Sequence, residues 1–401
     1  MSILSNKHIL LGVTGSIAGY KAADLASKLA QEGALVDVLL TGAGEKFITP
    51  LSFQSVTGRR AYVDKDLWGN EAHILHVSFG KTADLLVIAP CTANTIAKLA
   101  NGVADNLLTV TALAAECPLV IAPAMDGGMF YHPTMQENLL KLKKGGAIII
   151  GPAEGHLASG LTGKGRMIEP AEILGHIRIV LGKNGKLAGK RIVVTAGGTQ
   201  EALDPVRVIT NHSSGKQGYA VAQAALDAGA DVCLITAPTA LTPPVGARVV
   251  KVNSAMEMLN AVLAESADAL IMAAAAADFT PKTTAKDKMK KRDGIPQVEL
   301  TAAADILGTV ANSQLSGRRF QIVVGFAAES RDLLENAAEK LQSKKLDMIV
   351  ANDISSNDAG FAVDTNRVTF LFANGTIEIL PLMSKTEAAE KIIEHTSRLL
   401  E

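Results

Sequence analysis

The chain has 401 residues, with 39 basic against 40 acidic side chains and 4% aromatic residues. This balance excludes the cationic faces and base-stacking platforms on which nucleic-acid binding depends. The length indicates two or three domains, each able to hold a sizeable core.

Neither secretion nor membrane insertion is indicated. Cys91, Cys117 and Cys233 lie far apart without a CxxC pair, so neither a disulfide framework nor a zinc site is expected. The opening stretch MSILSNKHILLGVTGS is too short in apolar residues for a signal peptide, and the run ALIMAAAAADF is about half a membrane span. We expect a soluble, cytoplasmic protein.

The first half alternates strands and helices. Residues 7–44 predict a buried strand, a glycine turn, an amphipathic helix and a second strand ending at Thr41. Further strands are expected at DLLVIAP, PLVIAPA and AIIIGP. The run 147–150 in the last of these predicts a buried strand, and the loop after it, EGHLASGLTGKGRM, contains four glycines and should be mobile.

The second half begins in the same way. Residues 190–238 predict strand, glycine turn, helix and a strand ending at Thr236, followed by strands at ADALIMAA, QIVVGFAAE and LDMIVAND, a hairpin at RVTFLFANGTIEIL and a closing helix. The repeat predicts an α/β protein with two Rossmann-like doubly wound domains. The stretch LGKNGKLAGK gives expected boundaries of 1–181, a linker at 182–189, and 190–401.

The two glycine turns favour a phosphate or flavin mononucleotide over a dinucleotide. Neither turn has the GxGxxG pattern, and Thr41 and Thr236 stand where an acidic residue would hold the ribose of NAD. The sequence Thr-Gly-Ser-Ile at a helix N-terminus would attract phosphate, although tight turns alone would also explain the glycines. A dehydrogenase is therefore disfavoured.

Several motifs of the first half occur together: TGSIA, a histidine eight residues before Asp84, APCTAN, PAM and GKGRM. In combination they resemble the flavin-dependent cysteine decarboxylases, specifically the phosphopantothenoylcysteine decarboxylase half of bacterial bifunctional coenzyme A biosynthesis proteins of the Dfp type. The resemblance covers residues 5 to about 180. It implies a flavodoxin-like, FMN-dependent decarboxylase domain.

The resemblance assigns roles to individual residues. His76 matches the family's catalytic histidine, and His73 matches less well. The positions that match flavin contacts are Gly15, Ser16, Ile17, Thr41, Thr92 and Met125. The implied chemistry is oxidation of the cysteine thiol by FMN, loss of CO₂, and return of the electrons with protonation of an enethiolate.

Two positions depart from the family pattern. Asp126 stands in PAMD where the family has PAMN, at a position that contacts the substrate carboxylate, and an ionised aspartate would repel that group unless protonated or paired. Ser159 stands in LASG at the catalytic position of a proton-donating cysteine, and a hydroxyl is a far weaker acid than a thiol. Either another residue or a water molecule would then donate the proton, or this half-reaction would be impaired. Cys91 is the alternative thiol.

The second half resembles phosphopantothenate–cysteine ligase from residue 188 to about 400, most specifically in NHSSGK. The likeness makes Asn211 the catalytic residue that handles an acyl-cytidylate, and it places Asp278 and Phe326 in a cytidine pocket. Ala273, Ala274 and Ala275 would form the floor under the base. The implied reaction joins phosphopantothenate to cysteine with CTP and Mg²⁺. The sequence does not identify the residues that would bind the metal ion.

Activating a carboxylate with a nucleotide gathers negative charge, which calls for lysines. Lys288, Lys340 and Lys344 are candidates; Lys340 and Lys344 are four residues apart on one helical face, which would also suit a solvated surface. Residues 278–294, rich in lysine and threonine, predict a mobile lid over the nucleotide.

The implied partners are small molecules only, namely phosphopantothenate, cysteine and CTP, with neither nucleic acid nor membrane. The resemblance also implies a homo-oligomer, with a dodecamer of decarboxylase trimers and ligase dimers as one arrangement. Asp126 and Ser159 leave an alternative open: an active ligase whose first half is an impaired decarboxylase or a non-catalytic flavoprotein scaffold.

Overall fold

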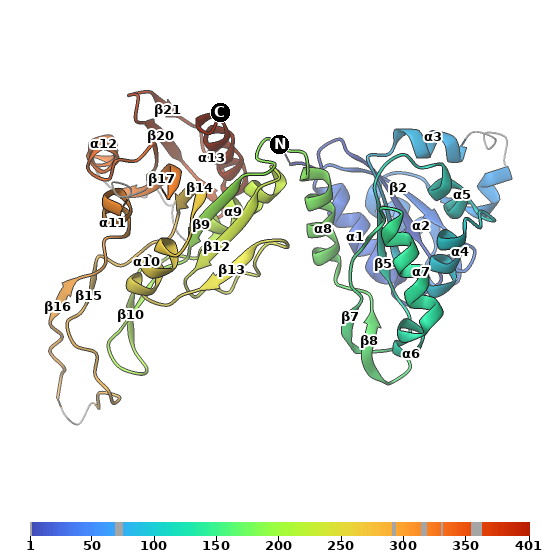
Figure 1. Cartoon of the computed structure of the whole chain (residues 1–401), viewed down its shortest axis with the longest axis horizontal. Helices are drawn as coiled ribbons and strands as arrows, with labels where there is room; N and C mark the ends of the chain where they lie inside the picture. Colours follow the sequence, from blue (N-terminus) through green and yellow to red (C-terminus); the bar gives the residue numbers. More distant parts are fainter. Residues whose placement is uncertain (1, 69–74, 291–293, 314–318, 330–331, 354–362) are drawn as a thin grey trace. The chain divides into compact units, whose positions relative to one another are not determined.

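The computed structural model describes residues 2–68, 75–290, 294–313, 319–329, 332–353 and 363–401. It divides into two compact units, Met1–Leu181 and Gly182–Glu401, each built around its own sheet (Figure 1). Both sheets are mostly parallel with helices on both faces, which confirms two doubly wound α/β domains. Among the described residues, no helix combines the length and apolarity that crossing a membrane would take.

The first unit alternates strands and helices and ends in a hairpin and a helix. Its elements are β1 (His8–Val13), α1 (Gly19–Gln31), β2 (Leu35–Leu40), η1 (Gly44–Lys46), α2 (Pro50–Thr57), β3 (Ala61–Val63), η2 (Asp64–Trp68), α3 (Leu75–Thr82), β4 (Leu85–Cys91), α4 (Ala93–Asn101), α5 (Leu107–Ala114), β5 (Leu119–Pro123), α6 (Gly127–Tyr131), α7 (Pro133–Lys144), β6 (Ile148–Ile149), β7 (Ala153–His156), β8 (Thr162–Arg166) and α8 (Pro170–Gly182).

The sheet of the first unit has the order β3-β2-β1-β4-β5-β6, and all its strands are parallel. The order reverses between β1 and β4, which places a crevice at the carboxyl ends of these strands. Apolar side chains fill both faces of the sheet, with α1 and α8 over one and α4, α5 and α7 over the other.

At the end of this unit one expectation needs correction, and the structure adds a strand pairing that the sequence did not indicate. The run 147–150 is a two-residue edge strand, and Ile148 is partly exposed because β6 has a neighbour on one side only. The glycine-rich stretch after it is a paired antiparallel hairpin, β7–β8, and only residues 157–161 form its turn. Its apolar and polar residues alternate too weakly for the strand pairing to be predicted from the sequence.

The second unit repeats the arrangement with additional antiparallel strands. Its elements are β9 (Arg191–Ala196), β10 (Gln200–Ala202), β11 (Val208–Thr210), α9 (Lys216–Asp227), β12 (Asp231–Thr236), β13 (Arg248–Lys251), α10 (Ala255–Leu263), β14 (Ala267–Met272), β15 (Phe279–Pro281), β16 (Leu300–Ala302), α11 (Ile306–Ser313), β17 (Phe320–Glu329), α12 (Leu333–Ser343), β18 (Met348–Asp353), β19 (Thr365–Asn366), β20 (Val368–Phe372), β21 (Ile377–Ile379), β22 (Met383–Ser384) and α13 (Lys385–Leu399).

Its sheet has the order β13-β12-β9-β14-β17-β18-β20-β21 and reverses between β9 and β14. The expected hairpin at the end is confirmed, because β20 pairs antiparallel with both β18 and β21. The segment 278–294, expected as a lid, begins with β15, which pairs with β16 in a ribbon that extends from the sheet (Figure 1); residues 291–293 lie outside the described part.

The segment 182–189, expected as a linker, packs on the second unit. Leu187 is fully buried in that unit's core, and its N–H donates to the carbonyl of Ala228 at 2.8 Å. The glycines and lysines around Leu187 concealed this single apolar anchor.

A buried carboxylate joins the first two strands of the first unit. Asp37 on β2 is 3% exposed and accepts hydrogen bonds from His8 Nε2 on β1 at 2.7 Å and from the Arg59 guanidinium at 2.8 and 2.9 Å. The bond to Asp37 raises the pKa of His8 above its usual 6.5. Burial opposes ionisation of Asp37, but the bonds from His8 and Arg59 lower the pKa of that carboxyl overall.

We therefore expect His8→Gln to destabilise the first unit in a pH-dependent way. A raised folded-state pKa stabilises fully below pH 6.5, and this contribution is lost as pH rises through the folded-state value. The free energy of unfolding of the variant should be about 1–2 kcal/mol lower than that of the wild type at pH 5.5, and the difference should be much smaller at pH 8.5. Denaturant unfolding followed at both pH values checks this, and an equal loss at both would contradict it.

Candidate active sites

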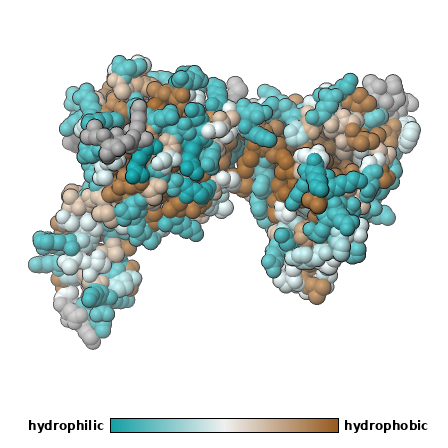
Figure 2. All heavy atoms as spheres, viewed as in Figure 1, coloured by the Kyte–Doolittle hydropathy of each residue, from teal (hydrophilic) through white to brown (hydrophobic). Residues whose placement is uncertain are grey.

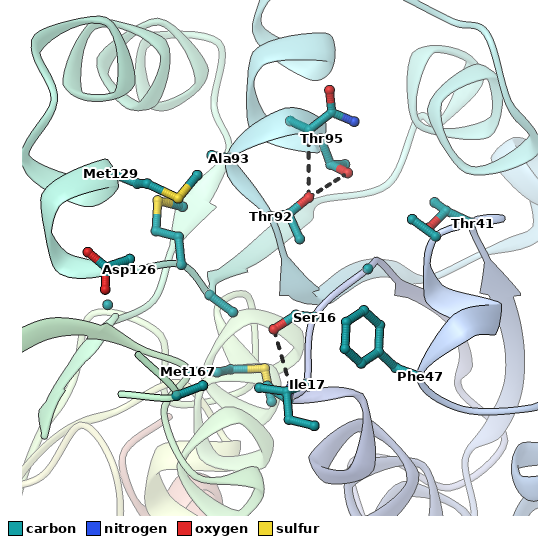
Figure 3. A pocket seen from close by; sticks show the side chains of 18 of the residues that line it. Ser16, Ile17, Thr41, Phe47, Thr92, Ala93, Thr95, Asp126, Met129 and Met167 are labelled. Atoms are coloured by element: carbon teal, nitrogen blue, oxygen red, sulfur yellow. Dashed lines mark hydrogen bonds between the residues drawn. The ribbon is translucent and has the colours of Figure 1, made fainter. Parts of the chain in front are cut away.

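A cavity of about 970 Å³ lies at the carboxyl ends of β1, β2, β4 and β5, where the order of the first sheet reverses. All six expected flavin-contacting positions line it, from four separate loops, and Figure 3 shows several of them facing one another. They are Gly15, Ser16, Ile17, Thr41, Thr92 and Met125.

One side of this cavity is built from backbone. A side chain at Gly15 would place its Cβ 2.6 Å from Ala43 Cβ, so only glycine allows the loops after β1 and β2 to approach this closely. Helix α1 follows with no side chain capping its N-terminus, which leaves N–H groups available to an anion. Ser16 Oγ accepts the N–H of Ala18 at 3.3 Å and steadies the loop.

The other side is apolar and unusually exposed. Ile17 is 60% exposed, Phe47 52% and Met129 51%, and all three line the cavity together with Met167 (Figure 3). Exposed apolar side chains that converge on a concave surface are typical of a site for a flat hydrophobic ring.

The hairpin β7–β8 closes the cavity by docking on the turn that follows β5. The N–H of Met125 donates to the carbonyl of Gly165 at 3.0 Å, and a Cβ at Gly165 would lie 2.2 Å from the Met125 carbonyl oxygen. At the tip of the hairpin, Ser159 Oγ donates to Asp126 Oδ2 at 2.7 Å. The two residues that depart from the family pattern are therefore hydrogen-bonded to each other across the cavity.

Asp126 is held in its ionised form in this arrangement. The Ser159 hydroxyl and the Gly128 N–H, which donates to Asp126 Oδ1 at 2.9 Å, lower the pKa of the carboxyl below its usual range. Asp126 thereby also caps the short helix α6. From the sequence, burial or a cation would have to neutralise Asp126 for the substrate carboxylate to bind, and neither is found among the described residues.

Cys91 does not replace the missing thiol. It lies at the end of β4, fully buried and outside the cavity, and burial raises the pKa of its thiol. Cys117 also lies outside the residues that line the cavity. Ser159 and Asp126 remain the groups at the expected acid position.

His76 lies on α3 and does not line the cavity, contrary to what a catalytic role within one copy requires. Its Nδ1 is buried and has no hydrogen-bond partner in the described structure. The next residue on α3, Val77, is 37% exposed, and helix α5, which packs against α3, carries Leu113 at 67% exposed. The surface on the right-hand side of Figure 2 includes hydrophobic patches. His73 lies outside the described residues.

A second cavity, of about 650 Å³, lies at the carboxyl ends of β9, β14, β17 and β18 in the second unit. It brings together Asn211, Ala273, Ala274, Ala275, Asp278, Phe326, Lys340 and Lys344. Asn211 Nδ2 donates to the carbonyls of Ala275 and Ala276 at 3.4 and 3.1 Å, which fixes this amide against the alanine floor.

The lysines of the second unit divide into two groups. Lys340 Nζ donates to the carbonyl of Phe326 at 2.9 Å, and Lys344 Nζ pairs with Asp305 at 2.5 Å, so both lie at the cavity wall rather than on a purely solvated face. Lys288 does not line the cavity. It belongs to the segment next to Met289, whose N–H donates to Asp204.

Sequence reasoning missed a cluster at the other end of this cavity. Helix α9 begins after Gly215 without a side-chain cap, and Lys216 and Lys385 line the cavity beside it. Two buried amides, Asn352 and Asn366, present Oδ1 atoms without a hydrogen-bond partner. Burial and the positive charge of the neighbouring Lys216 lower the pKa of Lys385. An anion bound here would offset both lysine charges, and they in turn would stabilise it. Of this cluster, the sequence motif NHSSGK contains Gly215 and Lys216 and indicates neither Lys385 nor the two asparagines.

Comparison with known proteins gives the family. Residues 2–182 match the flavoprotein family, and residues 187–399 match the C-terminal domain of the DNA/pantothenate metabolism flavoproteins. The coenzyme A biosynthesis bifunctional protein CoaBC of Bacillus subtilis is 45% identical over 99% of this chain and 98% of its own length. The chain belongs to the family of bifunctional coenzyme A biosynthesis proteins.

Other relatives agree over the full length. The CoaBC protein of Vibrio cholerae is 44% identical over 98% of each chain. A solved C-terminal domain of a CoaBC protein is 39% identical, covering 54% of this chain and 98% of that one with a TM-score of 0.46. The full-length identities to the CoaBC proteins and the two family matches confirm the expected family and bifunctional enzyme class. The roles of individual residues stay predictions.

We expect Ser159→Ala to raise the pKa of Asp126 toward its ordinary value, because the larger of its two hydrogen bonds is lost while the Gly128 N–H remains. A titration of ¹³C-labelled aspartate carboxyls by NMR measures this. Thr162→Ala, on the same hairpin but outside the cavity, should leave the pKa unchanged. An unchanged pKa in Ser159→Ala would contradict the assignment of the hydrogen bond.

Proposed function

We propose that this bifunctional enzyme joins 4′-phosphopantothenate to cysteine with CTP in its second unit. Its first unit then decarboxylates the resulting 4′-phosphopantothenoylcysteine with FMN. The observation that carries the proposal is that the matched residues of each half, apart from His76 and Lys288, converge on one cavity at the switch point of its own sheet. Converging backbone N–H groups, hydroxyls and apolar side chains are what such substrates require.

The first cavity fits a flavin mononucleotide. The close approach at Gly15 and the uncapped start of α1 suit a phosphate, while Ile17 and Phe47 suit one face of a ring system. Thr41 and Thr92 offer hydroxyls to the polar chain between ring and phosphate. Bound here, the flavin would supply a two-electron oxidation of the thiol and return of the same electrons.

The protein's own groups then bind and enclose the substrate. The hairpin β7–β8 excludes water by docking on the turn at Met125, and Asp126 and Ser159 face the space beneath it. The hydrogen bond from Met125 N–H to Gly165 must persist or re-form for closure.

His76 is proposed to act in the cavity of a second copy. It is outside its own cavity, yet its unpartnered Nδ1 and the exposed apolar residues beside it suit an interface. A homo-oligomer follows from this proposal, with trimers of the first unit and dimers of the second as the arrangement suggested by the family.

Mixed oligomers test this directly. We expect His76→Asn and Gly15→Val to be inactive in decarboxylation separately, the first without its histidine and the second without space for the flavin. Co-expressed chains should recover decarboxylation, because some cavities then receive an intact histidine from the neighbouring copy. No recovery in hetero-oligomers that bind flavin would contradict a shared site.

The second cavity would hold the nucleotide. Lys340 and Lys344 place positive charge at one end, and the start of α9 with Lys216 places it at the other, so both ends can bind phosphate groups. Phe326 and the alanine floor offer a surface for a base, and the choice of CTP rests on the family alone. The described residues contain no cluster of three His, Cys, Asp or Glu side chains that would hold a metal, so Mg²⁺ is proposed to enter with the nucleotide.

Replacing Lys340 by methionine should lower kcat/KM of the ligase about 100-fold, because a positive charge that would face the phosphates is removed from the wall of the cavity. The release of CMP, measured with phosphopantothenate, cysteine, CTP and Mg²⁺, gives this value. Lys391→Met, on the exposed face of α13, is the matched control. Equal activity of both variants would remove Lys340 from the site.

The alternative is an active ligase with an impaired or non-catalytic first unit. It is suggested by Asp126, whose negative charge no cation among the described residues neutralises, and by Ser159, which replaces the expected cysteine. Purified chain that turns over CTP and binds flavin but releases no CO₂ from phosphopantothenoylcysteine would establish this alternative.

A further inference from the structure

Any decarboxylation that leaves a methylene group must deliver a proton to the carbon that lost CO₂. The group that faces the departing carboxylate is therefore well placed to supply that proton. In this chain the cavity presents Asp126 and Ser159 at the expected position, and all three cysteines lie outside it. His156 on the same hairpin also lines the cavity, but the Asp126 carboxyl is the titratable group that the Ser159 hydroxyl holds at the expected position.

We propose that Asp126 is the catalytic acid of the decarboxylase unit, protonated when the substrate carboxylate binds beside it, and that Ser159 is the positioning residue that aims it. This inference rests on the proposed decarboxylation. It assigns to Asp126 the proton transfer itself rather than substrate binding alone.

Protonation follows from the like charges. In the free protein Asp126 is ionised, because the Ser159 hydroxyl and the Gly128 N–H lower the pKa of its carboxyl. The cavity is partly open to solvent, so the effect comes from direct contact: a substrate carboxylate bound against Asp126 raises the pKa of one of the two groups, and that group takes up a proton from solvent. The repulsion between the two carboxylates, which made Asp126 look unsuitable for substrate binding, is therefore what causes Asp126 to take up a proton.

The surrounding charges do not relieve this repulsion, because most are already paired. Lys98 pairs with Asp105 at 2.7 Å, and Lys21 and Arg166 both pair with Glu169, at 2.8 and 2.7 Å. Asp64 accepts the N–H of Gly42 at 2.8 Å. The titratable and charged side chains that line the cavity besides Asp126 are Tyr20, Lys21, Asp64, Lys98, Asp105, His156 and Arg166.

The proton transfer balances without a further reactant. Loss of CO₂ leaves its bonding electron pair in the carbon–carbon double bond of an enethiolate. The O–H bond of Asp126 then breaks, a C–H bond forms at the carbon that carried the carboxylate, and the sulfur charge becomes a C=S bond. Asp126 returns to its ionised form, which the Ser159 hydroxyl again stabilises at 2.7 Å. The electron pair already taken from the thiol then reduces the C=S bond.

The first experiment separates decarboxylation from proton delivery. Flavin-loaded Asp126→Asn should still release CO₂ but form the thiol product about 100-fold more slowly, the usual contribution of a general acid. The enethiol, which lacks two hydrogens, should accumulate and is detected by mass spectrometry. Glu154→Gln removes an exposed carboxylate of the same hairpin outside the cavity and should behave as wild type.

Rescue provides the second variant. In Asp126→Asn/Ser159→Cys a thiol of ordinary acidity occupies the hairpin tip, and thiol product should return. Ser159→Ala should keep thiol formation but shift its pH profile toward higher pH, since the pKa of Asp126 rises. Thiol formation by Asp126→Asn at the wild-type rate would overturn the proposal.

A binding measurement tests the loading step without turnover. An analogue with hydroxyl in place of the thiol is titrated into the flavin-loaded protein in two buffers of different ionisation enthalpy. We expect uptake of about one proton by wild type at neutral pH and none by Asp126→Asn. Binding without proton uptake by wild type would overturn the inference. A wild-type chain that takes up the proton yet releases no CO₂ would instead overturn the proposed decarboxylation.

Discussion

Both cavities depend on one constraint, that the strands of a parallel sheet all end at the same edge. The crossover helices begin at that edge, so the uncapped N-termini of α1 and α9, the glycine turns and the last residues of each strand lie there. In the first unit this gathers loops from β1, β2, β4 and β5, and in the second it gathers loops from β9, β14, β17 and β18. Residues more than a hundred positions apart thereby line one cavity.

The same constraint explains how much the sequence could predict. Buried runs followed by a glycine turn and an amphipathic helix marked the doubly wound halves, and the residues that follow directly on strands, such as Thr41 and Thr92, were correctly placed at the cavity. Lys216 ends the motif NHSSGK but was given no role there, and Asn366 was missed because it lies on an added antiparallel segment outside any motif. His76 was assigned by likeness, and its position outside the cavity of its own chain could not be predicted from the sequence.

The hairpin β7–β8 illustrates a different limit. Its glycines predicted mobility, whereas the structure shows a paired ladder that docks through Gly165 on Met125. Asp126 and Ser159, taken separately, each weakened the functional interpretation. Their hydrogen bond could not be seen in the sequence, since it joins residues 33 positions apart. Together they form a hydrogen-bonded polar pair that lines the cavity.

The central claim is that one chain couples amide formation to decarboxylation with residues that lie in separate cavities. The most direct test supplies phosphopantothenate, CTP, Mg²⁺ and cysteine labelled with ¹³C at its carboxyl to flavin-loaded protein, and follows CMP and ¹³CO₂ together. The account predicts that both are released in equal amounts once a steady state is reached. Continued release of CMP without ¹³CO₂ would contradict it.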